Sequence, residues 1–579
     1  MLTLAGCPPK ANDPAPEPNG NKTGKKTLVS PPSEAGQTAM RFVSDPTLQE
    51  MRVVYENGKD GGALSIVETL GGGVGILDYD ADGRDDLFLP IGGTIDADRT
   101  LGPLPSRLLR NATPLDDASP SALDWQDVSE SSGAAATPMY SHGAACCDYD
   151  NDGFRDVLLT GYRRLQLLRN MGDGSFVDVT DQAGLLADDT HSTTAAWGDL
   201  NRDGWADLYV THYTDWGPGN DPACGNGRNP EVCSPKRFGP LDDAIYLSDG
   251  DGTFSPAAGL DLSGGKGLAV MLADVDGDAM LDAIVANDTT ENHLYMNQTA
   301  PGEASLSLRE DAIGRGMAFD DQAGMTGSMG IALSDYNGDQ KPDFLVSNYE
   351  QELFALYRNE GDGDFTHVSK RVGLQLLGRL MVTFGCVACD FDADGDEDVA
   401  LVNGHVMYNP INTPMAQLPL LLEMRRRTVN GRETRTLSRT QPGGYFSQPH
   451  VGRGLADADL DRDGRRDLAV SHTLEPAEAL LNRTPTEGRT LGLVLVGTAD
   501  SREPIGTVVL ARLASGRVLY RQLVGGVSYL STPARDLPLA WPADDPPESI
   551  EIRWPTGEPT TIAADAIGDR DRLVVVQGD

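Results

Sequence analysis

The sequence predicts an all-β protein: a seven-bladed β-propeller followed by a small C-terminal β-sandwich domain. Three observations lead to this prediction. A nine-residue acidic pattern occurs seven times, short apolar runs follow each copy, and the 579 residues include 66 glycines and 37 prolines. Such a composition favours turns and short strands over long helices, and repeated short-strand units are typical of propellers.

The acidic pattern reads D-x-[DN]-x-D-x-x-x-D. Its copies begin at Asp78, Asp148, Asp199, Asp274, Asp335, Asp390 and Asp459. An apolar run follows each ninth-position Asp, as in Leu87-Phe88-Leu89 and Ala283-Ile284-Val285. These runs are too short for helices and rich in residues that favour strands. Each acidic loop is therefore expected to join two strands.

A hairpin follows the second strand in most copies. Gly172-Asp173-Gly174, for example, separates two short apolar runs, as expected of a tight hairpin turn. Each unit then has four strands, the number in a propeller blade. The seventh unit stops after Asn482, whereas residues 40–43 precede the first acidic loop without a unit of their own. We expect this N-terminal strand to complete the last blade and close the ring, which removes exposed strand edges.

The acidic loops predict calcium sites, up to seven Ca²⁺ in all. Side chains at positions 1, 3, 5 and 9 and the carbonyl at position 7 form the oxygen-rich ligand set that Ca²⁺ prefers. One copy alone is as compatible with an acidic turn, but seven copies in register favour metal binding. Ala279 and Gln340 replace the loop glycine, so the fourth and fifth sites are expected to be the least ideal.

The predicted ligands form seven sets, one per loop, in which position 7 contributes only its carbonyl oxygen. They are Asp78, Asp80, Asp82, Arg84, Asp86; Asp148, Asp150, Asp152, Phe154, Asp156; Asp199, Asn201, Asp203, Trp205, Asp207; Asp274, Asp276, Asp278, Met280, Asp282; Asp335, Asn337, Asp339, Lys341, Asp343; Asp390, Asp392, Asp394, Asp396, Asp398; and Asp459, Asp461, Asp463, Arg465, Asp467.

Four segments are expected along the chain. Residues 1–7 end in Leu4-Ala5-Gly6-Cys7, which resembles a bacterial lipobox, and residues 8–38 have the composition of a disordered tether. The propeller is assigned to 39–483 and the β-sandwich to 484–579. These features predict an exported protein of the bacterial cell envelope, outer membrane or periplasm, either lipid-anchored at Cys7 or secreted. Apart from that anchor, no contact with a membrane is expected.

The chain resembles a known family at several motifs. They are the stretches 68–80, 197–205, 403–406 and 453–456, and in the C-terminal part Ile505-Gly506, 525–531 and 552–557. The blades resemble the FG-GAP/VCBS repeats of integrin-type propellers, and the whole chain resembles the cartilage acidic protein family with its ASPIC/UnbV C-terminal domain. The resemblance implies a seven-bladed propeller with a small β domain, secreted or on the cell surface, and implies little about activity. Residues 417–441 depart from the family pattern, as a basic insertion in the last blade in place of a regular hairpin.

The cysteines divide into two groups. Cys224 and Cys233 flank a short polar loop and are predicted to form a disulfide, which an oxidising compartment would permit. The other four of interest are Cys146, Cys147, Cys386 and Cys389. They are interpreted mainly as free buried thiols, with a soft-metal site or a vicinal disulfide as the alternatives.

Three further features carry both a structural and a functional interpretation. Trp541, Trp554 and Tyr529 are expected to be core residues rather than a sugar-stacking platform. His212, Asn287, Asn348, Asn403 and His472, each five positions past a closing Asp, are expected to cap turns rather than to line a binding mouth. The six arginines 425, 426, 427, 432, 435 and 439 form either a solvated face or a docking patch for an acidic glycan or for the protein's own acidic loops.

The sequence predicts a binding protein rather than an enzyme. The net charge of −40 argues against nucleic acid as a partner. No common catalytic motif occurs, so the leading hypothesis is a monomeric adhesion, scaffold or ligand-binding protein for an extracellular protein or polysaccharide. The alternative is a carbohydrate-active propeller such as a polysaccharide lyase or hydrolase. His142, His212, His405 and Tyr213 would be its first catalytic candidates.

Overall fold

In the computed structural model, the described part of the chain comprises residues 40–115, 120–226, 228–262, 264–301, 303, 305–429 and 432–578. The predicted signal remnant 1–7 with Cys7 and the tether 8–38 lie outside these residues. Residues 39–579 form one compact unit.

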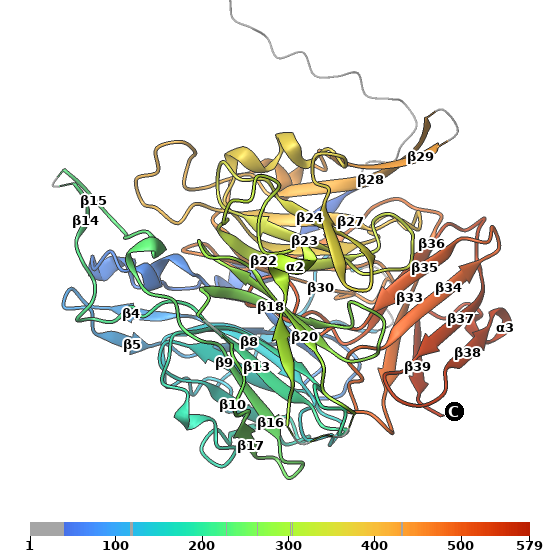
Figure 1. The fold of residues 1–579 in the computed structure, drawn as a ribbon, viewed down its shortest axis with the longest axis horizontal. Helices are drawn as coiled ribbons and strands as arrows, with labels where there is room; N and C mark the ends of the chain where they lie inside the picture. The colour runs from blue at the N-terminus through green and yellow to red at the C-terminus, as the bar shows by residue number, and fades with distance from the viewer. Residues whose placement is uncertain are drawn as a thin grey trace, which may run out of the picture. The chain divides into compact units, whose positions relative to one another are not determined.

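Seven four-stranded sheets follow one another through the described residues before 483 (Figure 1). Each is antiparallel, and in each the acidic loop joins the first two strands. Sheet by sheet, the strands are β2 (Gly75–Leu77), β3 (Asp86–Leu89), β6 (Arg107–Asn111), β7 (Trp125–Asp127); β8 (Ser141–Cys147), β9 (Asp156–Gly161), β10 (Gln166–Asn170), β11 (Phe176–Asp178); β12 (Ser192–Gly198), β13 (Asp207–His212), β16 (Ala244–Ser248), β17 (Phe254–Pro256); β18 (Gly267–Ala273), β19 (Asp282–Asn287), β20 (His293–Asn297), β21 (Leu308–Glu310); β22 (Ser328–Ser334), β23 (Asp343–Asn348), β24 (Ala355–Gly361), β25 (Asp364–His367); β26 (Thr383–Cys389), β27 (Asp398–Asn403), β28 (Leu420–Val429), β29 (Arg432–Arg439); and β30 (Gly452–Ala458), β31 (Asp467–His472), β32 (Glu478–Asn482), β1 (Phe42–Ser44).

The N-terminal strand completes the last sheet, as the sequence predicted. β1 pairs antiparallel with β32, with Phe42 opposite Asn482 and Val43 opposite Leu481. The first strand of every sheet contacts the first strand of the next, and β30 contacts β2 in the same way. The chain therefore forms an all-β propeller in which the two ends of the repeat meet.

The C-terminal residues form two packed sheets, seen as the red and orange strands in Figure 1. One sheet contains β36 (Leu537–Trp541), β33 (Arg489–Val496) and β39 (Arg572–Val576). The other contains β35 (Val518–Gln522), β34 (Val508–Leu513), β37 (Pro547–Arg553) and β38 (Thr560–Ala563). Alternate apolar residues of both sheets face one another, and Trp541 and Trp554 belong to the resulting core. The predicted sandwich and the core role of these two tryptophans are both found.

The connection between β35 and β36 leaves the sandwich and runs along the inner strands of the propeller. We call residues 525–532 the plug. Backbone hydrogen bonds join Gly525 to Leu272 of β18, Ser528 to Ile331 of β22, Leu530 to Ala144 of β8, and Thr532 to Val74 and to Ile76 of β2. Because these four strands belong to four different sheets, the plug lies where the inner strands converge.

Tyr529 lies in the plug and not in the core of the sandwich. Its side chain is fully buried, and its hydroxyl donates a hydrogen bond to the carbonyl oxygen of Leu70 at 3.0 Å. Its ring meets that of Phe384 edge-on, with centroids 4.9 Å apart. Burial excludes the sugar-stacking interpretation, but the core that Tyr529 joins belongs to the propeller, which corrects the expectation from sequence.

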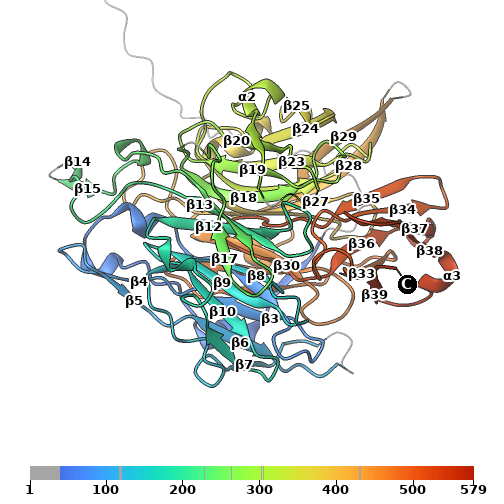
Figure 2. The same ribbon diagram turned by 60° about the horizontal axis from the view of Figure 1, so that its bottom comes forward.

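The basic segment also lies elsewhere than expected. Residues 420–439 supply β28 and β29, which pair as the third and fourth strands of the sixth sheet. The segment is therefore a regular, elongated hairpin of the sixth blade and not an insertion in the last one. It extends beyond the neighbouring blades in both views (Figures 1 and 2).

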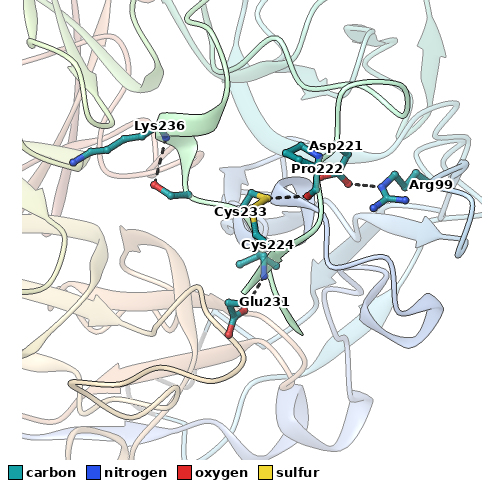
Figure 3. The surroundings of a disulfide bond; sticks show 9 residues. Arg99, Asp221, Pro222, Cys224, Glu231, Cys233 and Lys236 are labelled. Atoms are coloured by element: carbon teal, nitrogen blue, oxygen red, sulfur yellow. Dashed lines mark hydrogen bonds and ion pairs between the residues drawn. A yellow bond between two sulfur atoms is a disulfide. The ribbon is translucent and has the colours of Figure 1, made fainter. Parts of the chain in front are cut away.

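Other elements are short. They are α1 (Pro46–Met51), α2 (Ala312–Arg315) and α3 (Ala564–Ile567); the 3₁₀ turns η1 (Lys59–Gly61), η2 (Ile66–Thr69), η3 (Leu185–Ala187), η4 (Pro235–Arg237), η5 (Leu374–Leu376), η6 (Gly378–Leu380) and η7 (Gly444–Ser447); and the hairpins β4 (Gly93–Ile95) with β5 (Leu101–Pro103) and β14 (Cys224–Asn226) with β15 (Asn229–Glu231). Cys224 and Cys233 are joined in a disulfide with Cα atoms 5.2 Å apart at the base of the β14–β15 hairpin (Figure 3). Among the helices formed by the described residues, none is long and apolar enough to cross a membrane.

Candidate metal sites

The backbone of every acidic loop turns left-handed at positions 4 and 6. Position 6 is glycine in five loops, but Ala279 and Gln340 adopt the same conformation with φ of 68° and 66°. Position 4 is Gly277 and Gly338 in those same two loops. In these two loops the glycine stands at position 4, and a residue other than glycine adopts the strained left-handed conformation at position 6.

The first and ninth carboxylates are fixed by backbone N–H groups. In each loop the first Asp accepts a hydrogen bond from the N–H at position 6, as Asp78 does from Gly83 at 2.9 Å. The ninth Asp accepts from a backbone N–H of the third strand, as Asp86 does from Asn111 at 2.7 Å. These contacts close the loop and leave other carboxylate oxygens facing its centre.

In five loops the side chains at positions 1, 3 and 9 converge. Their carboxylate oxygens lie within 4.8 Å of one another in the clusters Asp78–Asp80–Asp86, Asp148–Asp150–Asp156, Asp274–Asp276–Asp282, Asp390–Asp392–Asp398 and Asp459–Asp461–Asp467. The fourth loop is among them despite Ala279. The third and fifth loops carry Asn201 and Asn337 at position 3, so each offers two carboxylates and one amide there.

Several of these oxygens are buried without a hydrogen-bond partner among the described residues. They include Oδ1 of Asp80, Asp148, Asp392 and Asp459. Burial, together with neighbouring carboxylates, raises the pKa of Asp148 to about 7 and that of Asp459 to about 8. Buried anionic oxygens that lack a donor destabilise the fold unless a cation neutralises them. The residues present therefore fit Ca²⁺, a hard cation that prefers oxygen ligands.

The side chain at position 5 belongs to none of the five converging clusters, and in three loops it pairs with an arginine from outside the loop. Arg110 lies 2.6 Å from Asp80 and 2.9 Å from Asp82. Arg169 and Arg483 pair in the same way with positions 3 and 5 of the second and seventh loops. The fifth carboxylate faces an arginine from outside the loop in each case and is not part of the converging cluster.

Two arginines of the β28–β29 hairpin face the sixth loop. Arg426 and Arg435 pair with the side chain of Asp396, as does Arg517 of the C-terminal domain, whose Nη2 lies 3.1 Å from Oδ1. Asp396 thus uses its side chain in ion pairs, whereas the sequence assigned it only a carbonyl ligand. Of the interpretations offered for the basic segment, contact with the protein's own acidic loops is the one found for these two arginines.

One recurring residue was not recognised from the sequence: the Asn near the end of the third strand in five of the sheets. Its backbone N–H binds the ninth Asp, and its side chain reaches the neighbouring blade. Asn170 Nδ2, for example, donates to the carbonyl oxygen of Tyr79 at 2.8 Å. The same bond joins Asn111 to Leu460, Asn297 to Leu200, Asn359 to Val275 and Asn482 to Phe391. The recurring Arg-Asn pair at residues 110–111, 169–170 and 358–359 was the available signal.

The C-terminal domain rests on the face that carries the acidic loops. Arg155, beside the second loop, forms a bidentate ion pair with Glu503 at 2.8 and 2.9 Å, and both side chains are buried. Arg466, beside the seventh loop, pairs with Asp536 at 2.9 Å. The acidic loops, the sandwich domain and the plug therefore belong to one connected assembly.

The other predicted residues have structural partners. His142 and His405 are fully buried, and His212 binds Asp188 and the carbonyl oxygen of Asp242. The predicted turn capping is found at Asn287, Asn348 and His472, whose side chains bond backbone carbonyl oxygens four or five residues further on. His212 and Asn403 instead bond carbonyl oxygens 30 and 15 residues further on and so close longer loops. The four cysteines 146, 147, 386 and 389 are free and buried, as expected. Tyr213 lines a cavity between the blades.

Comparison with known families defines the class of protein. Residues 148–210 and 335–401 match the FG-GAP-like repeat, and residues 497–579 match the domain described as ASPIC and UnbV. Two segments of the propeller thus match FG-GAP-like repeats, and the C-terminal domain matches ASPIC/UnbV. The plug lies within that domain's matched residues.

Among curated proteins the chain is similar to cartilage acidic protein 1. It is 24% identical to the Homo sapiens protein over 361 residues, covering 59% of this chain and 48% of the relative. Identity to the Xenopus tropicalis protein is 25%, covering 72% of this chain and 61% of the relative. The chain thus spans about half the length of the human relative that it matches.

A solved structure gives a fainter likeness. A lectin of Agrocybe aegerita that recognises non-reducing terminal N-acetylglucosamine aligns with a TM-score of 0.36 at 14% identity, covering 72% of this chain and 91% of the lectin. A likeness of this size carries no argument about function.

Proposed function

We propose that the protein is an exported, calcium-stabilised propeller that acts as a binding or scaffold protein for an extracellular protein or polysaccharide. The observation that carries the calcium part is the set of five converging carboxylate clusters, each within one blade, with buried oxygens that lack a donor among the described residues. Bound Ca²⁺ would neutralise these carboxylates and cross-link the first and second strands of a blade. The chain's own residues position the ligands through the backbone bonds to positions 1 and 9.

The disulfide and the similarity to cartilage acidic protein 1 support export. A disulfide in the β14–β15 loop persists in an oxidising compartment. The pairing of β1 with β32 and the plug both restrain the ring, which suits a rigid platform for binding. The three histidines put forward for catalysis are buried and bonded to neighbouring groups, so binding is the function that the geometry favours.

The test combines metal analysis with a ligand screen. Purified full chain is examined by elemental analysis, then applied to polysaccharide and extracellular-protein arrays with Ca²⁺, with EDTA, and with Ca²⁺ restored. We expect several equivalents of calcium and a ligand signal that EDTA abolishes and Ca²⁺ restores. Depolymerisation of an arrayed polysaccharide, lost in His405→Ala, would instead indicate an enzyme, and protein free of calcium would refute the metal part.

A further inference from the structure

A cavity of about 210 Å³ lies at the mouth of the propeller where the β14–β15 loop is located. We call it the axial pocket. Residues from five of the seven blades line it, and Phe384, against which the plug residue Tyr529 packs, forms part of its wall. The disulfide residue Cys233 and the following Pro235 and Lys236 form part of its rim. Near the disulfide the side chain of Lys236 points away from the two sulfur atoms (Figure 3).

The inner wall of the axial pocket is apolar. It is formed by Ile66, Leu70, Leu268, Met329, Phe384 and Val406. The guanidinium of the fully buried Arg453 lies behind Phe384, 4.1 Å from the ring centroid. Its nitrogens donate to the carbonyl oxygens of Thr69, Gly404 and Gly452, which hold it in place. An apolar wall fixed from behind in this way is suited to an apolar group of a ligand.

One side of the axial pocket carries two carboxylates. Burial raises the pKa of Asp288 to about 6 and that of Glu352 to about 7. The Tyr213 hydroxyl donates to Asp288 at 2.6 Å, and the Gly327 N–H donates to Glu352 at 2.8 Å. Beside them, Thr289 presents a buried hydroxyl that has no hydrogen-bond partner among the described residues. The pocket thus pairs an apolar wall with a compact end of acidic and hydrogen-bonding groups.

Among the described residues no ion pair joins Asp288 or Glu352 to a cation, and the guanidinium nitrogens of Arg453 bond backbone carbonyl oxygens instead. Lys266 uses its ammonium to bond the carbonyl oxygen of Pro235 at 2.9 Å, and Lys236 is exposed on the rim. Further acids surround this mouth: Glu231 accepts from the backbone of Tyr408 and Asn409, and Glu350 from Asn412 and Thr413. On a chain of net charge −40, the electrostatic potential here favours a cation.

We propose that the axial pocket binds a small organic cation, an ammonium group carried on an apolar body. The ammonium would bind Asp288 and Glu352 and donate to the Thr289 hydroxyl, while the apolar body packs on Met329 and Phe384. The volume fits this class, since a dry cavity of roughly 150 Å³ holds benzene. The pocket is too small for a folded partner and holds at most one small molecule or one side chain.

The test uses phenethylammonium as the probe, with isothermal titration calorimetry on the calcium-loaded full chain at neutral pH. We expect saturable binding that is at least tenfold tighter than that of 2-phenylethanol, the neutral analogue, and no measurable binding of 3-phenylpropionate. Glu352→Gln and Asp288→Asn should each weaken phenethylammonium binding at least tenfold. Glu291→Gln serves as the matched control, because Glu291 belongs to the same loop as Asp288 and does not line the pocket.

Any of three results would show that no organic-cation site exists here, and a fourth would change its ligand. The three are the absence of phenethylammonium binding at 10 mM, equal affinity for the alcohol, and unchanged affinity in Glu352→Gln with an unchanged melting temperature. The fourth, tighter binding of Nα-acetyl-lysinamide than of phenethylammonium, would overturn the assignment of a small molecule in favour of a protein side chain as the ligand. Each result is independent of the array screen, so this site and the proposed function can fail separately.

Discussion

The two mouths of the propeller use carboxylates in opposite ways. At the mouth covered by the C-terminal domain, Asp residues stand in a fixed nine-residue loop and their oxygens converge within single blades. At the other mouth, Asp288 and Glu352 come from loops of different blades and face a cavity beside apolar residues. The first arrangement suits a compact inorganic cation and the second an organic one. Spacing along the chain, and not acidity alone, distinguishes a structural metal site from a ligand pocket.

The centre of the propeller and the mouth with the axial pocket also differ in how their residues are held in place. The plug lies along the inner strands and forms backbone hydrogen bonds to four sheets. The mouth with the axial pocket ends in connecting loops and a short disulfide-bonded hairpin. We therefore expect perturbations of the acidic-loop side to change stability strongly and those of the pocket side to change ligand binding.

Removal of calcium should have the largest effect. Each occupied site stabilises the folded state by about 2.7 kcal/mol when free calcium is 100 times its Kd, and several sites add together. We expect EDTA to lower the melting temperature by roughly 10 °C or more. Differential scanning calorimetry with and without restored Ca²⁺ measures this. An unchanged melting temperature would remove the distinction between the two mouths.

Loss of the buried ion pair beneath the C-terminal domain should have the second-largest effect on stability. Glu503→Gln leaves Arg155 buried without its bidentate partner, which costs about 3–5 kcal/mol in the free energy of unfolding. Urea denaturation gives the difference. The matched control is Glu551→Gln in the same domain, because Glu551 pairs with Arg553 on the surface and its loss should cost about 0–1 kcal/mol. Equal effects of the two variants would contradict the docking of this domain through a buried ion pair.

Loss of one inter-blade asparagine should have a moderate effect. Asn170→Ala removes side-chain bonds to the carbonyl oxygens of Tyr79 and Arg155 and should destabilise the protein by about 1–3 kcal/mol. Asn220→Ala is the control, since Asn220 is exposed and makes one long bond to a backbone carbonyl. If thermal melts of the two variants coincide, the asparagines do not hold the blades together.

The smallest expected effect depends on pH. His212 lies 3.1 Å from Asp188 and, although burial opposes its charge, this hydrogen bond and the negative charge raise its pKa above the ordinary value. A raised pKa in the folded state stabilises the protein below the unfolded pKa of about 6.5, and the gain is lost as pH rises through the folded pKa. His212→Asn should therefore lower the melting temperature more at pH 6 than at pH 9. A larger loss at pH 9 would reverse the sign and exclude a charged His212.

Local patterns in the sequence were sufficient to predict most of the fold. The acidic loops, the apolar runs after them and the unpartnered strand at residues 40–43 predicted the four-stranded units and the pairing of β1 with β32. These features depend on residues close in sequence or on strand pairing that a repeat makes regular. The convergence of the carboxylates at positions 1, 3 and 9 was predictable for the same reason, because these positions lie in one short loop. The pairing of the position-5 carboxylate with Arg110 could not be predicted, because Arg110 comes from another strand.

Only the tertiary structure decided which residues of distant segments meet at the centre of the propeller. Residues 525–532 follow a strand of the sandwich, and their sequence does not indicate that they bond to β2, β8, β18 and β22. The axial pocket likewise joins Leu70, Lys236, Asp288, Glu352 and Met407, which lie far apart in the sequence. Local sequence determines which short runs form buried strands and which loops carry converging carboxylates. The arrangement of side chains from different blades around one axis depends on the packing of the whole ring.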